Sequence, residues 1–299
     1  MEQSRVLRLD DAARVTARQQ HVDALNQWSF IRFAAPAALR GWIGGYCDYS
    51  EHTRGFTTRR ELPHAEGVLI LNLGDPVRIT GGDGRLLKLD AGEAFVAGAH
   101  LKPALSHSGG QQSGIQIELP LATLRRLLGR PMHTLCEQVV DLRTLWGAVG
   151  VAPLQRLLEA DTSEARVALL DALLIRRLQI APVFDRRRLA ALHLLRHAPQ
   201  LDLNGIAARV GWTRKHLATQ ITDTVGVGPR CFRRLLRFQC LQQKLRALGE
   251  DPPDWADLAA QAGYCDQSHL SREFREFAQM TPGEFERRRL ADGGGVVEC

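Results

Sequence analysis

The stretch Asp257-Leu-Ala-Ala-Gln-Ala-Gly-Tyr-Cys-Asp-Gln-Ser-His-Leu-Ser-Arg-Glu-Phe-Arg-Glu-Phe277 predicts two short helices joined at a glycine. Asp254 can cap the first helix, and Gly263 supplies the left-handed turn that a residue with a Cβ resists. The second helix is expected to begin near Asp266. Apolar residues at helical spacing form the inward side of the pair: Leu258, Ala259, Ala262, Leu270, Phe274 and Phe277. This is the plan of a helix-turn-helix unit.

A second copy of this plan lies upstream, with its central Gly211 placed 52 positions before Gly263. Asp202 and Thr213 can cap its two helices. Its inward residues are Leu203, Ile206, Ala207, Val210, Leu217 and Ile221. A longer helix near 232–248 would join the two units and set their spacing. One such unit could simply build a helical bundle, but the repetition favours DNA binding.

The outward faces of the two second helices carry side chains suited to DNA. Gln can bond adenine in a bidentate way, Arg can bond guanine, and Ser, Thr and His add shorter hydrogen bonds. The predicted DNA-binding residues are Arg214, Lys215, Thr219 and Thr222 in the first unit, and Gln267, Ser268, His269, Ser271, Arg272 and Arg275 in the second. These residues form the candidate nucleic-acid site.

With the following Thr281-Pro-Gly-Glu-Phe-Glu-Arg, the second unit resembles the DNA-binding domain of AraC/XylS-type bacterial transcription regulators. The resemblance covers about 189–289 and includes Gly226-Val-Gly-Pro before the joining helix. It implies two recognition helices that enter successive major-groove segments on one face of the duplex, roughly 34 Å apart. It also implies an N-terminal cupin-like domain that holds an effector or dimer contacts.

The first unit departs from the family pattern in two places. Ile221 stands where the family usually has a core Phe, and Thr222-Asp223-Thr224 lacks the usual basic residue. We therefore expect the first recognition helix to hold phosphate less firmly than the second. Whether it contacts bases stays open.

The positive charge of the chain is concentrated at this end. The chain has 299 residues, 44% hydrophobic and 24% charged, which is typical of a soluble globular protein of two domains. Residues 186–290 hold 18 Lys and Arg against 11 Asp and Glu, whereas residues 1–185 hold 21 against 20. Such an excess favours the phosphate backbone. No apolar run has the length of a signal peptide or a membrane span, so we expect a cytoplasmic protein with no membrane partner.

The N-terminal part shows short apolar runs between glycine-rich turns from about 30 to 119, a pattern typical of antiparallel strands. Gly81-Gly-Asp-Gly between two such runs predicts a hairpin turn. We therefore predict an α+β protein. Its parts would be a cupin-like β-barrel within 1–120, a helical linker or dimerisation region over 121–185, an all-α domain with two helix-turn-helix units over 186–290, and a flexible tail over 291–299.

Three amphipathic helices are expected after the strands, at 121–128, 154–160 and 166–178. The last helix carries an apolar stripe made of Leu169, Leu170, Leu173 and Leu174. The same periodicity serves an intrachain core or a dimer seam, and both remain open.

The predicted barrel shows no pattern of catalytic or metal-binding residues. The histidines there are scattered without the His-x-His pair of metal cupins, and the six cysteines form no Cys-x-x-Cys pair. We therefore predict no catalytic residue, no metal site and no cofactor. Aromatic and cationic side chains fix small molecules in apolar pockets, although core packing explains the same residues. The candidate effector-binding residues are Trp42, Tyr46, Tyr49, Phe56, Arg59 and Arg60.

The residues and the resemblance together predict a sequence-specific transcription regulator that is not an enzyme. A small-molecule effector bound to the N-terminal domain would control it. Its partners would be promoter DNA, the effector, RNA polymerase if it activates, and a second copy of the chain. The alternative is an effector-independent protein in which the first domain oligomerises or binds a partner while the second tethers it to DNA.

Overall fold

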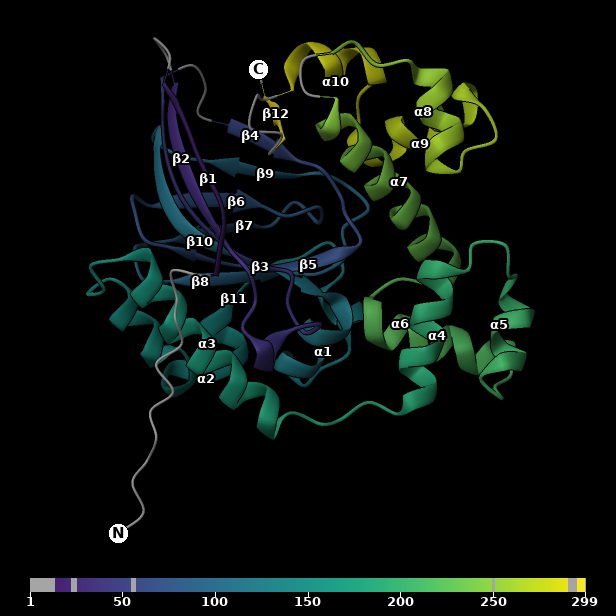
Figure 1. The fold of residues 1–299 in the computed structure, drawn as a ribbon, viewed down its shortest axis with the longest axis horizontal. Coiled ribbons are helices and arrows are strands. Elements are labelled where there is room, and N and C mark those ends of the chain that lie inside the picture. Colours follow the sequence, from purple (N-terminus) through teal and green to yellow (C-terminus); the bar gives the residue numbers. More distant parts are fainter. Residues whose placement is uncertain (1–13, 23–25, 55–57, 249–250, 290–294, 299) are drawn as a thin grey trace.

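The computed structural model describes residues 14–22, 26–54, 58–248, 251–289 and 295–298. The chain folds into a β-rich N-terminal part, a group of helices against one of its sheets, and a helical C-terminal part beside them (Figure 1). None of the described helices is long and apolar enough to cross a membrane. The α+β class and the two-part architecture expected from the sequence are confirmed.

The described strands form two sheets whose pairings are antiparallel. The larger sheet has the order β1-β2-β3-β10-β5-β8-β11, and the smaller sheet has the order β12-β4-β9-β6-β7. The larger sheet consists of β1 (Val15–Val22), β2 (Asn26–Phe33), β3 (Gly45–Thr53), β5 (Glu66–Asn72), β8 (Ala94–Ala97), β10 (Gln111–Pro120) and β11 (Val139–Asp141). The smaller sheet consists of β4 (Thr58–Glu61), β6 (Val77–Thr80), β7 (Leu86–Leu89), β9 (Ala104–His107) and β12 (Val296–Val297).

The two sheets pack face to face through a small apolar cluster. Its buried members are Val68 and Phe95 from the larger sheet, and Val77, Ile79 and Leu89 from the smaller one. Alternate residues of β5, such as Leu69 and Leu71, point to the opposite face, where helices cover them. Because β5 is buried on both faces, its sequence is a continuous apolar run and does not alternate with polar residues.

The strands do not close into the single barrel that the sequence suggested. Among the described residues, no ladder joins the larger sheet to the smaller one. The free edge of β4 is instead occupied by β12, which comes from the other end of the chain. The predicted hairpin is present, because β6 pairs with β7 across Gly81–Gly84 and Gly84 has a φ of 81°. The prediction of a β-rich N-terminal domain was therefore correct, whereas the prediction that its strands close into a barrel was wrong.

Helices cover the outer face of the larger sheet. They are α1 (Leu121–Leu128), η3 (Met132–Leu135), α2 (Leu142–Val151), η4 (Ala152–Leu157) and α3 (Ser163–Ile180), while the short η2 (Ala37–Leu39) precedes β3. In the apolar stripe of α3, Leu170 and Leu174 are fully buried, and Leu169 and Leu173 are partly buried against the same core. The stripe therefore packs within the chain.

The C-terminal part contains α4 (Arg186–His197), α5 (Leu203–Arg209), α6 (Arg214–Val225), α7 (Pro229–Ala247), α8 (Trp255–Ala262), α9 (Gln267–Ala278) and α10 (Pro282–Arg288). Asp202, Thr213 and Asp254 accept hydrogen bonds from backbone N–H groups of the first turns of α5, α6 and α8, as predicted. The two central glycines, Gly211 and Gly263, have φ values of 69° and 82°. Both helix pairs are thus built as the sequence indicated.

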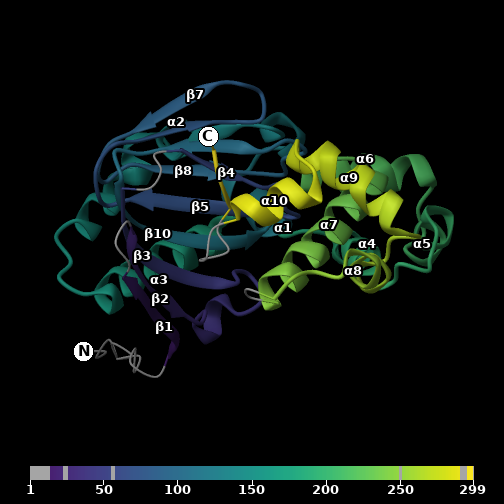
Figure 2. The ribbon, with the colours of Figure 1, turned by 90° about the horizontal axis from the view of Figure 1, so that it is seen from above.

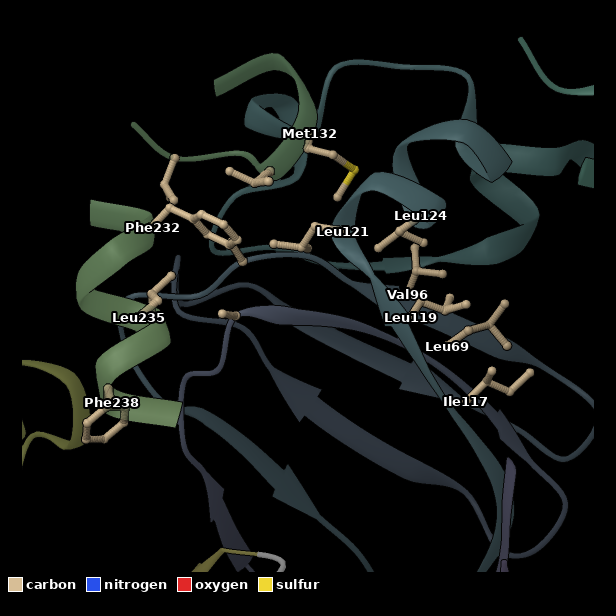
Figure 3. Close-up of a cluster of buried hydrophobic side chains, with 14 of the residues drawn as sticks. Leu69, Val96, Ile117, Leu119, Leu121, Leu124, Met132, Phe232, Leu235 and Phe238 are labelled. Atoms are coloured by element: carbon tan, nitrogen blue, oxygen red, sulfur yellow. The ribbon is translucent and has the colours of Figure 1, made fainter. Parts of the chain in front are cut away.

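One hydrophobic core runs from the larger sheet into the helical part. Leu119 and Leu121 lie at the junction of β10 and α1, and Phe232 and Leu235 of α7 belong to the same buried cluster (Figure 3). Polar contacts reinforce the junction, since Gln242 of α7 donates a hydrogen bond of 2.7 Å to the carbonyl oxygen of Pro63. The two parts therefore pack as one body.

The end of the chain returns to the N-terminal part (Figure 2). Val296 is fully buried and pairs with Arg60, and Glu298 accepts two hydrogen bonds from the Arg60 guanidinium, at 2.5 and 2.7 Å. Arg60 also donates to the carbonyl oxygen of Ala278, at the end of α9. A flexible tail was predicted over 291–299, but its described residues hold β12 because β4 offers an unpaired edge and a cation to Glu298.

Candidate nucleic-acid interface

The two helix-turn-helix units lie at opposite ends of α7 (Figure 1). Their second helices, α6 and α9, are fixed by buried residues on the inward side, namely Leu217 and Ile221 in α6, and Leu270, Phe274 and Phe277 in α9. Ile221 is completely buried, so it fills a core position of α6. The opposite sides of both helices are left for other contacts.

The outward face of α9 forms one surface hollow. Its lining consists of Gln267, Ser268, Ser271, Arg272 and Arg275, all of which the sequence singled out. Ser271 is half-buried and the others are exposed. Two guanidinium groups, one amide and two hydroxyls thus converge on a surface that can meet both base edges and phosphates.

His269 differs from its neighbours on α9. Its Nδ1 accepts a hydrogen bond of 3.4 Å from the backbone N–H of Cys265, and its Nε2 lies 3.7 Å from Oε1 of Glu273. The ring also meets Tyr264 edge-on. The side chain is therefore held against the protein and braces the start of α9, which leaves base contact by His269 an untested prediction.

A buried ion-pair network behind α9 was not found from the sequence. Glu273 is 5% exposed, and its Oε1 accepts hydrogen bonds from Arg234 at 2.7 Å and from Arg237 at 2.8 Å. Arg234 also pairs with Glu276, and these hydrogen bonds to carboxylates raise its pKa. Both arginines belong to α7, so the network ties the recognition helix to the joining helix. The sequence feature that could have indicated this network is Glu273, a charged residue directly before the core residue Phe274.

The first recognition helix is partly engaged elsewhere. Arg214, Lys215 and Thr219 are exposed and Thr222 is half-buried. Near its end, Asp223 accepts hydrogen bonds from Arg125 of α1 and Arg188 of α4. Asp223 thus anchors the end of α6 to the N-terminal part, and the start of α6 carries the exposed polar face.

The candidate effector residues do not form one site. Trp42 packs under the guanidinium of Arg126, at 4.4 Å from the ring centre. Buried Tyr46 donates a hydrogen bond of 2.6 Å to Asp171. Arg59 pairs with Glu51 at 2.7 Å, and Arg60 is engaged by Glu298. Phe56 lies outside the described residues. These four described side chains could contact a ligand by their chemistry, but in the structure they make packing contacts, hydrogen bonds and ion pairs within the chain.

Tyr49, in contrast, lines a cavity of about 160 Å³ between the two sheets. Apolar side chains from both sheets form most of its wall, together with His64 and His100. Burial lowers the pKa of each of these histidines to about 4, so both rings are neutral at pH 7. No spacing in the sequence relates the two histidines, because they come from two loops that only the fold brings together. Within the described part of the chain, no group of three or more metal-ligating side chains occurs.

Comparison with known proteins identifies the helical region. Residues 206–288 match the family model of a helix-turn-helix domain. An uncharacterized HTH-type transcriptional regulator of Staphylococcus aureus (strain MSSA476) is 29% identical over 91 residues, and a protein of the same description from strain COL is also 29% identical over 91 residues. The match covers 30% of this chain, and the chain spans only 12% of the length of these curated relatives.

Two solved structures resemble more of the chain. ToxT from Vibrio cholerae O395 is 12% identical with a TM-score of 0.49, over 88% of this chain and 98% of that chain. The AraC-like transcriptional activator CuxR is 15% identical with a TM-score of 0.30, over 75% of this chain and 82% of that chain.

Proposed function

Because residues 206–288 form a helix-turn-helix domain of the AraC type, we propose that the chain is a transcription regulator that binds specific DNA sites through two recognition helices. The observation that carries the proposal is the surface hollow on α9, where Gln267, Ser271 and Arg272 converge while core residues fix the helix from behind. Arg and Gln are the side chains that read guanine and adenine most often in the major groove. The function is thus recognition of DNA, without catalysis.

The two units would bind with unequal strength. α9 presents two exposed arginines, whereas the exposed face of α6 is limited to its first turns because Asp223 is held by Arg125 and Arg188. α7 joins the units with a continuous helix, which fixes their separation. We therefore assign the main base contacts to α9, with Arg214 and Lys215 of α6 adding phosphate or base contacts in the next groove segment.

The N-terminal part would control this binding. It contacts the first unit through Arg125 and Asp223, and the second through Arg60 and the end of α9. A ligand that favours one arrangement of these contacts would shift the population that fits the promoter. The cavity between the sheets, with neutral histidines in its wall, supports an effector role over a purely oligomerising one.

Selection of genomic DNA fragments by the purified chain at physiological salt tests the proposal. Gln267→Ala/Arg272→Ala removes the two side chains of α9 that are proposed to contact bases. Arg143→Ala removes an exposed charge of α2 and is the matched control. We expect the wild type and the control to recover one recurrent motif that the double variant loses. Weak, salt-sensitive recovery of fragments without a motif would sink the proposal.

A further inference from the structure

The cavity between the two sheets has the size of a single ring. Its volume is about 160 Å³, and a dry cavity of roughly 150 Å³ is known to admit benzene. Val68, Ile70 and Phe95 of the larger sheet face Val77 and Ile79 of the smaller one across it. These walls suit the flat, apolar faces of an aromatic or alicyclic ring.

The polar part of the cavity wall has unused hydrogen-bonding capacity. His100 is 8% exposed, and neither of its ring nitrogens makes a hydrogen bond of good geometry to a described residue, although the backbone of Gln138 is near enough to oppose the lowering of its pKa. The nearest carboxylate oxygen, Oε2 of Glu137, lies 3.9 Å from Nδ1, too far for a hydrogen bond. Buried polar groups are normally paired, so a ring left in this state marks a place for a ligand atom.

His64 complements His100. Its Nδ1 accepts a hydrogen bond from the backbone N–H of Glu66, so the proton of the neutral ring lies on Nε2, which is left as a donor. Both rings line the same cavity. A neutral His100 has one donor and one acceptor nitrogen. Together the pair offers both donor and acceptor, which matches a hydroxyl group.

The charge of the wall disfavours an anion. Among the described residues that line the cavity, Glu61 is the charged one, and no Lys or Arg joins it. Arg59 and Arg246 act on Tyr49 and His64 from outside the lining, so a bound carboxylate would leave water without a cation in direct contact and next to a residue of its own sign. An uncharged ligand avoids both costs.

We propose that this cavity binds an uncharged, single-ring compound bearing a hydroxyl group, with the hydroxyl paired to His64 and His100. The inference deepens the effector role proposed above and rests on it. His64 lies between Pro63 and Ala65, whose backbone atoms are held by Gln242 and Gln239 of α7. A ligand that bonds to His64 thus acts on the segment that seats the helix joining the two DNA-binding units.

Three probes built on one methylbenzene ring, p-cresol, toluene and p-toluate, test the ligand class on the full chain. Calorimetry and the ring-proton NMR signals of the histidines report binding. We expect p-cresol to bind at least about tenfold more tightly than toluene or p-toluate, a factor worth about 1.4 kcal/mol. The signals of His64 and His100 should shift. Equal affinity for p-cresol and toluene, or tighter binding of p-toluate, would overturn the proposal.

Variants separate the hydroxyl contact from the apolar cavity. His100→Leu should weaken p-cresol about tenfold and leave toluene unchanged, whereas His193→Leu, an exposed histidine of α4, should change neither. Ile79→Phe fills the cavity and should abolish binding of both probes, which keeps the test decisive if His100→Leu does not fold. Unchanged p-cresol affinity in His100→Leu would count against the proposed contact.

Promoter binding is measured in parallel, so that the two proposals can fail separately. A chain that binds its DNA motif but no probe refutes the ligand class alone. A chain that binds p-cresol as expected, with no DNA motif, supports the ligand class and refutes the regulator.

Discussion

Arg272 lies on the exposed face of α9, in the same hollow as Gln267. If its guanidinium reads a guanine, Arg272→Ala should weaken specific binding by about 1–3 kcal/mol and relax the preference at one base pair. Competition with operators altered one base pair at a time measures this, with Arg143→Ala as the charge control. An equal loss on every competitor would assign Arg272 to the phosphate backbone instead.

Glu273 lies on the buried side of α9 and links this helix to Arg234 and Arg237 of α7. Glu273→Ala would leave Arg234 and Arg237 without their shared carboxylate, and we expect the second unit to lose about 1–3 kcal/mol of stability, since both arginines remain partly exposed. Urea unfolding and DNA affinity should fall together. Glu273→Gln keeps one acceptor and should lose less. A stable variant with normal DNA affinity would contradict the bracing role.

His64 and His100 make the stability of the chain depend on pH. Burial lowers their pKa values from an ordinary 6.5 to about 4, so the unfolded chain binds more protons between these limits. The contribution of the two histidines to stability should therefore be constant above pH 6.5 and fall as the pH drops toward 4, at up to about 1.4 kcal/mol per pH unit for each histidine. Urea unfolding across this range checks it. His64→Gln/His100→Gln should flatten the slope, and an unchanged slope would contradict the assignment.

At the level of elements, the pairing of β12 with β4 is expected to protect the backbone N–H groups of β4 from hydrogen exchange. Glu298→Ala removes the partner of Arg60, and the backbone N–H groups of β4 should then exchange with deuterium faster, while those of β5 should not change. Glu159→Ala, an exposed carboxylate near α3, is the matched control. The ion pair lowers the pKa of Glu298, so wild-type protection should also decline as acid protonates that carboxylate. Identical exchange in all three chains would refute the role of β12.

Short-range sequence patterns were sufficient to predict the two helix pairs, but they were insufficient to predict how the sheets are arranged or where the cavity lies. Caps such as Thr213 and turn glycines such as Gly263 act within a few residues, and the structure has both where they were predicted. Closure of the sheets depends on which edge finds a partner, and β4 finds one more than 200 residues away. His64 and His100 were considered among the scattered histidines, but no spacing related them, because only the fold brings them to one cavity.

At the scale of the whole molecule, the N-terminal part restrains both DNA-binding units. Asp223→Ala removes the acceptor that ties Arg125 to the first unit, and Glu298→Ala removes the carboxylate that bridges Arg60 of β4 and Arg288 of α10. We expect the wild type to prefer one separation of its two half-sites and the double variant to tolerate an insertion of about 5 base pairs, roughly half a helical turn, with less loss. Gel-shift titrations on a spacing series measure this. The same spacing preference in both chains would show that α7 alone sets the separation.

The pairing of β12 with β4 also has a consequence for biosynthesis. Arg60 and Glu298 are 238 residues apart, so the smaller sheet is incomplete until the helical region has left the ribosome. Until then β4 presents a bare edge to other nascent chains, the kind of surface that seeds aggregation. A fragment ending before α4 keeps that edge permanently exposed. Its yield of dispersed protein should therefore be lower than that of the full chain, and a synthetic peptide with the β12 sequence should restore it.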